Sequence, residues 1–124
     1  MLDELYNVKV LTDLISSGMQ NFLIIEENRI PVGFAAYSLT DEATTKLNKL
    51  YVLPEKHGRG LGKKLLDEVI LRAKNTDGKR LILNVNRYNP AFHFYVKEGF
   101  SIEREEDIPI GPYWMNDYVM AKNI

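Results

Sequence analysis

The stretch of sequence that decides the fold is Val52-Leu53-Pro54-Glu55-Lys56-His57-Gly58-Arg59-Gly60-Leu61-Gly62-Lys63. It joins a strand-like segment to a segment with helical spacing, and its three glycines stand at alternate positions. Glycine lets the backbone approach a ligand closely and adopt a positive φ. The amides at the start of a helix attract anions, and Arg59 and Lys63 add positive charge. The stretch therefore predicts a strand, a loop and a helix that together hold a diphosphate.

The spacing of the glycines narrows the kind of diphosphate site. The phosphate loop of nucleoside triphosphatases and the dinucleotide fingerprint both space their glycines differently from Gly58-x-Gly60-x-Gly62. Taken alone, the loop has a second interpretation, a flexible glycine turn without a ligand.

Hydrophobic periodicity on both sides of this stretch predicts the other elements. Apolar residues at helical spacing predict a helix, in one or two short pieces, over about 2–17. Apolar runs predict strands over 22–25, 32–39 and 44–53 as an antiparallel meander, and over 81–85, 100–108 and 113–122. A one-sided apolar pattern predicts a helix over 60–75, and Asn89-Pro90 opens a short helix that Gly99 ends. This order predicts a mixed α/β (α+β) domain with one central sheet.

Composition limits the class of protein. A chain of 124 residues, 45% of them hydrophobic, predicts one domain, residues 1–124, with a buried core. A net charge of -1 offers no basic excess for nucleic acid or a membrane surface. Cysteine is absent, and His57 and His93 cannot form a histidine-rich metal site. We therefore expect no metal, no membrane span and no secretory signal, and a cytoplasmic protein.

Two motifs in order carry a family resemblance. The first is His57-Gly58-Arg59-Gly60-Leu61-Gly62 with the preceding Leu50-Tyr51-Val52-Leu53-Pro54. The second is Asn89-Pro90-Ala91-Phe92-His93-Phe94-Tyr95-Val96-Lys97-Glu98-Gly99-Phe100. From about Phe22 to the C-terminus, the sequence resembles the GNAT superfamily of acetyl-CoA-dependent N-acetyltransferases. The resemblance implies a mostly antiparallel sheet, flanked by helices and splayed between the strands near 44–53 and 80–86.

The same resemblance implies an acyltransferase that moves the acetyl group of acetyl-CoA to a primary amine in a ternary complex. The pantetheine arm would pair with the backbone of the third strand, and the diphosphate would lie on the loop amides, with His57 in the family's loop-shaping position and Asn89 near the cofactor. The implied cofactor-binding residues are Leu50, Tyr51, Val52, His57, Gly58, Arg59, Gly60, Leu61, Gly62, Lys63 and Asn89, with Asn86 as a weaker candidate.

Tyr95 is the predicted catalytic residue. Helical spacing turns it inward with Ala91 and Phe92, and a phenol with a pKa of about 10 can protonate a leaving thiolate. The alternative is an aromatic core residue. Relatives often carry a glutamate on the third strand, but 44–48 contains no carboxylate. The general base stays unassigned, with Asp41, Glu42 and Asp117 as nearby candidates.

The two ends of the chain raise further expectations. Only about twenty residues precede Phe22, so the domain looks N-terminally shortened. We expect its first strand to be missing, and the edge this would expose predicts a homodimer. The segment 108–122 is similar to the end of the spermidine/spermine acetyltransferases. This favours a small amine such as a polyamine as the acceptor. The acidic cluster of this region either attracts such a polycation or is simply a solvated strand face; its members are Glu103, Glu105, Glu106 and Asp107. Tyr113 and Trp114 either line an acceptor cleft or cap the core. The alternatives are a protein or peptide N-acetyltransferase and a catalytically silent CoA-binding protein.

Overall fold

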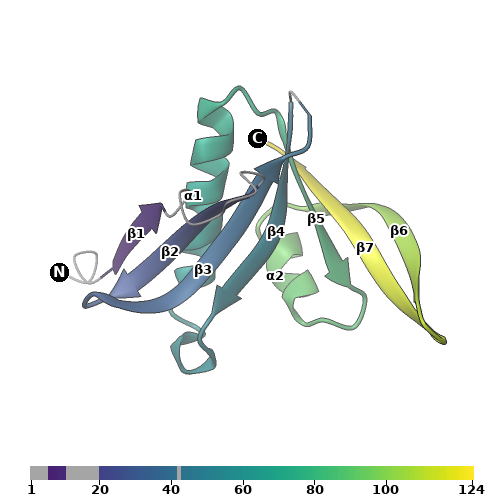
Figure 1. Cartoon of the computed structure of the whole chain (residues 1–124), viewed down its shortest axis with the longest axis horizontal. Helices are drawn as coiled ribbons and strands as arrows, with labels where there is room; N and C mark the ends of the chain where they lie inside the picture. The colour runs from purple at the N-terminus through teal and green to yellow at the C-terminus, as the bar shows by residue number, and fades with distance from the viewer. Residues whose placement is uncertain (1–5, 11–19, 42) are drawn as a thin grey trace.

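The structure, a computed structural model, describes residues 6–10, 20–41 and 43–124. Within them, seven strands form one sheet in the order β1-β2-β3-β4-β5-β7-β6 (Figure 1). The strands are β1 Tyr6–Val10, β2 Asn21–Glu27, β3 Ile30–Leu39, β4 Thr44–Val52, β5 Arg80–Asn86, β6 Ser101–Ile110 and β7 Tyr113–Asn123. The helices are the short 3-10 turn η3 Pro54–Lys56, α1 Leu61–Asn75 and α2 Ala91–Lys97. The predicted mixed α/β fold and its order of elements from residue 21 onward are confirmed.

The sheet begins with a strand that the sequence analysis does not predict. Tyr6–Val10 lies inside the predicted helix over 2–17, yet it forms β1, antiparallel to β2, with Val8 opposite Ile25. The expectation that the first strand is missing is therefore wrong. The segment Tyr-Asn-Val-Lys-Val alternates apolar and polar residues and contains β-branched valines, which favour a strand. The rest of the predicted helix lies outside the described residues. The homodimer was predicted because the first strand was expected to be missing, so the presence of β1 removes that reason.

The sheet is continuous on each side of a short parallel junction. β4 pairs with β5 only over Thr44–Leu47 and Arg80–Leu83. Beyond these pairs, β4 continues beside β3 to Val52, whereas β5 continues beside β7 to Asn86. The register of β3 against β4 shifts at Asn48, which forms a bulge that bends β4. The predicted splay between these two strands is thus confirmed.

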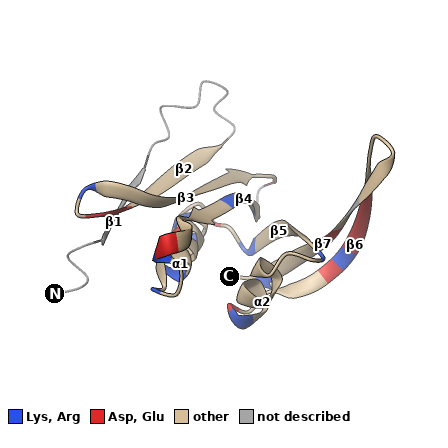
Figure 2. Ribbon diagram, turned by 90° about the horizontal axis from the view of Figure 1, so that it is seen from below, with Lys and Arg blue, Asp and Glu red and all other residues tan. Residues whose placement is uncertain are grey.

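Both helices lie on one face of the sheet (Figure 2). The apolar side of α1 is buried against β2, β3 and β4 and consists of Leu61, Leu65, Leu66, Val69 and Ala73. On α2, the Phe92 ring meets that of Tyr118, with centroids 5.3 Å apart. The opposite face, which carries no helix within the described residues, is called the open face below. Neither described helix α1 nor α2 is long and apolar enough to cross a membrane.

Side chains divide between the two faces by simple alternation. Leu23 and Ala35 are buried under α1, whereas Phe22 and Phe34 stack with each other, centroids 6.3 Å apart, on the open face. Tyr51 continues this aromatic row, with its ring 5.7 Å from that of Phe34. Aromatic side chains thus line the open face of the sheet, and this row ends at Tyr51, near the end of β4 that leads into the glycine loop.

Candidate active site

A cavity of about 350 Å³ lies where β4 and β5 separate. Because the ladder between the two strands stops at Leu47 and Leu83, the backbone groups beyond it no longer pair across the gap. The cavity is lined by Leu47, Asn48, Lys49, Leu50 and Tyr51 of β4, by Leu83, Asn84 and Val85 of β5, and by Phe34, Asn89, Ala91 and Tyr95. The structure thus brings together four residues of the predicted site, namely Leu50, Tyr51, Asn89 and Tyr95.

Three polar residues of this lining are absent from the predicted site. Asn48 and Lys49 are consecutive exposed residues in β4, and Asn84 is the exposed residue of β5. The pair Asn48-Lys49 breaks the alternation of β4, which is the signature of a bulge in the sequence. Asn84 interrupts the apolar run Leu81-Ile82-Leu83. Both signals could have drawn attention to these positions.

The glycine loop forms the turn between β4 and α1. Gly58 and Gly60 have φ of 81° and 76°, a conformation that glycine adopts without strain. The first amide that donates within α1 belongs to Lys64, to the carbonyl oxygen of Gly60 at 3.1 Å. The amides of Leu61, Gly62 and Lys63 therefore have no acceptor within the helix. A Cβ at Gly62 would meet the Phe94 ring at 3.6 Å, an ordinary contact, so packing among the described residues does not require glycine there.

His57 fastens the loop to the end of β4. Its Nε2 lies 2.8 Å from the carbonyl oxygen of Val52. Because a carbonyl oxygen only accepts, Nε2 carries the proton and donates it. This contact supports the loop-shaping role predicted for His57. The contact also occupies the carbonyl oxygen of Val52. Val52 does not line the cavity, whereas Leu50 and Tyr51 do.

The two predicted phosphate-binding cations lie in ion pairs around the loop. Arg59 Nη1 is 3.4 Å from Glu27 Oε2, and Lys56 Nζ is 2.7 Å from Glu27 Oε1. Lys63 Nζ is 3.1 Å from the Glu98 carboxylate, whose hydrogen bond raises the pKa of the lysine. Exposed pairs of this kind contribute little to stability, so their cations can exchange partners.

Tyr95 is both a core residue and a cavity residue. Its ring is 8% exposed and meets those of Phe94 and Phe100 edge-on, with centroids 5.2 Å and 5.7 Å away. Burial raises the pKa of its phenol to about 12. The phenol therefore stays protonated at neutral pH and is available as a proton donor.

Two asparagines shape the segment before α2. The Oδ1 atom of Asn89 accepts the amide of Ala91 at 2.9 Å, and its carbonyl accepts the amide of Phe92, so the predicted cap is confirmed. The Oδ1 atom of Asn86 accepts the amide of Tyr88 at 2.9 Å and is occupied with the turn. Asn89 also lines the cavity, whereas Asn86 does not.

The three candidate bases differ in position. The Oδ1 atom of Asp41 accepts the amides of Ala43 and Thr44, and the bond from Ala43 is the main cause that lowers the pKa of this carboxyl. Asp41 is therefore a turn residue outside the cavity. Glu42 lies outside the described residues. Asp117 is buried on β7.

The acidic strand β6 is largely neutralised by arginines (Figure 2). Arg80 and Arg104 hold Glu103, Arg104 holds Glu106 at 2.9 Å, and Arg87 holds Glu105 and Asp107 at 3.4 Å and 3.1 Å. At the hairpin tip, Tyr113 is 75% and Trp114 64% exposed, so neither caps the core. Neither residue lines the cavity.

Comparison with known proteins identifies the class that this fold and cavity define. A sequence profile of the acetyltransferase (GNAT) domain matches residues 18–102. This is more than half of the chain, so the chain belongs to the GNAT acetyltransferase family.

Particular relatives place the chain more closely. An uncharacterised N-acetyltransferase of Mycobacterium tuberculosis is 36% identical over 94 residues, which are 75% of this chain and 60% of the relative. The ribosomal protein bS18-alanine N-acetyltransferase of Haemophilus influenzae is 39% identical over 82 residues, 65% of this chain and 54% of that protein. PaiA N-acetyltransferase from Thermoplasma acidophilum, solved in complex with coenzyme A, superposes with a TM-score of 0.72 at 28% identity and covers 86% of this chain and 62% of that one. The chain thus spans less than two thirds of the length of each of these relatives.

Proposed function

We propose that residues 1–124 form one N-acetyltransferase domain that transfers the acetyl group of acetyl-CoA to a primary amine. The observation that carries the proposal is the cavity between β4 and β5, which joins the unpaired strand backbone to Tyr95 and Asn89. The loop that begins α1 directly follows β4, so the amides that can hold a diphosphate lie next to the backbone that can hold an amide-containing arm.

Acetyl-CoA fits this arrangement from end to end. Its diphosphate would lie on the amides of 58–63, while Arg59 and Lys63 exchange their carboxylate partners for phosphate oxygens. Glycine at position 62 suits a close approach by the ligand, since packing against the described residues would also allow a Cβ there. The pantetheine arm would run along Leu50 and Tyr51 towards Asn89. The coenzyme A bound by PaiA supports this assignment.

Tyr95 would act at the leaving sulfur. The ammonium form of the acceptor first loses a proton to water. The neutral amine then attacks the thioester carbonyl carbon, and the new C–N bond forms. When the C–S bond breaks, the Tyr95 phenol donates its proton to the departing thiolate, and the proton released from the amine nitrogen restores the phenol. Burial raises the pKa of the phenol to about 12, so Tyr95 is protonated at neutral pH and carries the proton that the thiolate needs.

The acceptor is the least constrained part of the proposal. A small primary amine such as a polyamine is our first candidate, although arginines already pair with the β6 carboxylates that would attract it. The similarity to the bS18-alanine enzyme favours a protein N-terminus as the second candidate. A cytoplasmic location and a homodimer stay predictions, and light scattering tests the second.

Calorimetric titration with acetyl-CoA followed by thiol release tests the proposal. The panel contains spermidine, benzylamine and a peptide with an N-terminal alanine. We expect binding of acetyl-CoA and thiol release with at least one amine. Binding without release on any amine would instead identify a silent CoA-binding protein, and failure to bind would refute the proposal.

A further inference from the structure

Asp117 on β7 is the least exposed carboxylate among the described residues, at 6%. Its Oδ1 atom is buried and has no hydrogen-bond partner in this part of the chain. A buried carboxylate is costly unless a cation or hydrogen-bond donors compensate for it. Among the described residues, the Asp117 carboxyl group therefore keeps one buried oxygen atom without a hydrogen-bond partner.

The neighbouring cations are already paired with other acids. Arg104, which lies on β6 opposite Val119, pairs with Glu103 and with Glu106, the residue of β6 opposite Asp117. Arg87 holds Glu105 and Asp107 and stacks over the Tyr118 ring on the helix side. Thus each exposed carboxylate of β6 pairs with an arginine, whereas no ion pair of Asp117 is found within residues 6–10, 20–41 and 43–124.

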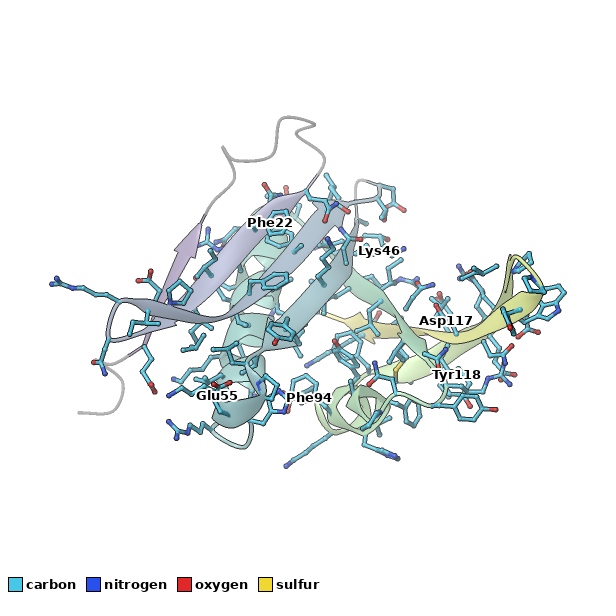
Figure 3. The ribbon with its side chains drawn as sticks, turned by 60° about the horizontal axis from the view of Figure 1, so that its bottom comes forward. Phe22, Lys46, Glu55, Phe94, Asp117 and Tyr118 are labelled. Atoms are coloured by element: carbon cyan, nitrogen blue, oxygen red, sulfur yellow. The ribbon has the colours of Figure 1, made fainter. Side chains whose placement is uncertain are left out.

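The sheet register places Asp117 beside the cavity. Asp117 lies opposite Asn86, and Val119 lies opposite Asn84 of the cavity lining. Asp117 and Asn84 are therefore diagonal neighbours on the same face, about 7–8 Å apart. Tyr118 contacts Phe92 on the helix side, so by alternation Asp117 points to the open face (Figure 3).

We infer that Asp117 binds the ammonium group of the acceptor as it enters from the open face. This inference rests on the proposed function and makes it more specific, because it selects acceptors that are charged amines over neutral arylamines. An N–H of the ammonium supplies the hydrogen bond that Oδ1 lacks, in an environment where water competes little.

The test compares Asp117→Asn with the control Asp77→Asn, which removes the same charge from an exposed site at the end of α1. Benzylamine is the charged probe and aniline the neutral one, and spermidine and the alanine peptide are assayed as well. We expect Asp117→Asn to lower kcat/KM for the charged amines by at least about tenfold through a higher KM, with less than about threefold change for aniline. Acetyl-CoA affinity stays unchanged, and the melting temperature stays level or rises.

The remaining outcomes separate the two proposals. If Asp117→Asn acetylates charged amines like the wild type, the inference falls and the proposed function stands. If the variant loses charged and neutral amines equally and melts earlier, Asp117 is a structural residue and the inference falls. A wild-type protein that binds acetyl-CoA but acetylates no amine overturns the inference and the transfer reaction together. One that does not bind acetyl-CoA overturns the cofactor site as well.

Discussion

The two ends of the proposed site are built in different ways. At the loop end, the groups proposed to bind the cofactor are backbone amides of consecutive residues, 58–63, in a loop with left-handed glycines that His57 ties to Val52. At the open face, the groups come from single side chains on separate strands, such as Lys49 on β4, Asn84 on β5 and Asp117 on β7. Backbone amides stay the same when side chains are substituted, so a site built from them keeps binding the same kind of ligand. A site built from side chains can be altered one residue at a time. The difference suggests a fixed cofactor and a variable acceptor.

The largest effect on this comparison is expected from removing the Tyr95 hydroxyl, the one group proposed to act between the two ends. We expect Tyr95→Phe to lower kcat by about a hundredfold with little change in the KM for acetyl-CoA. Steady-state thiol release measures both, and Tyr88→Phe, an exposed tyrosine, is the control. An unchanged kcat would remove Tyr95 from the chemistry and leave it as a core aromatic.

The same variant changes the response to alkali. Burial raises the Tyr95 pKa to about 12, so the folded protein holds this proton above the ordinary pKa of about 10. Stability from this residue is therefore complete below about pH 10 and is lost as the pH rises towards 12, by about 2 kcal/mol. Urea unfolding across this range should show a steeper loss for the wild type than for Tyr95→Phe. Parallel curves would contradict the burial of the phenol.

Replacing a loop glycine tests the backbone end alone. Gly60→Ala and Gly111→Ala are matched, because both glycines have a positive φ and neither Cβ would meet an atom within 4 Å. Each should cost about 1 kcal/mol of stability from strain. Only Gly60→Ala should weaken acetyl-CoA binding, by about tenfold, as measured by calorimetry. Equal affinities in the two variants would show that the loop is a plain turn.

The smallest effect is expected from the side-chain charge at the loop. Arg59→Ala should weaken acetyl-CoA binding only by about two- to fivefold, and the difference should shrink as salt is added. Lys74→Ala, at the opposite end of α1, is the control and should leave affinity unchanged. A loss at Arg59 larger than that at Gly60 would reverse the comparison and make this a side-chain site.

The sequence predicted the elements of the loop end but not the arrangement of side chains on the open face, for a physical reason. The glycines, the Asn89 cap and the helical stripe of α1 are local patterns, so their geometry can be inferred from neighbours in the chain. The position of Asp117 beside Asn84 depends on the register of β5 against β7, which pairs residues far apart in sequence. The missed strand β1 has only five residues, and apolar residues on both sides of it fit a helical spacing over 2–17, which hid its alternation.

The four-rung parallel junction between β4 and β5 has a consequence for redesign. The opening beyond it is created by the paths of two main chains, and no single side chain keeps it apart. Exchanging Lys49, Asn84 or their neighbours should therefore reshape the entrance without closing the passage. A directed-evolution library confined to these strand positions could therefore select for new acceptor amines while the proposed coenzyme-binding loop is left unchanged.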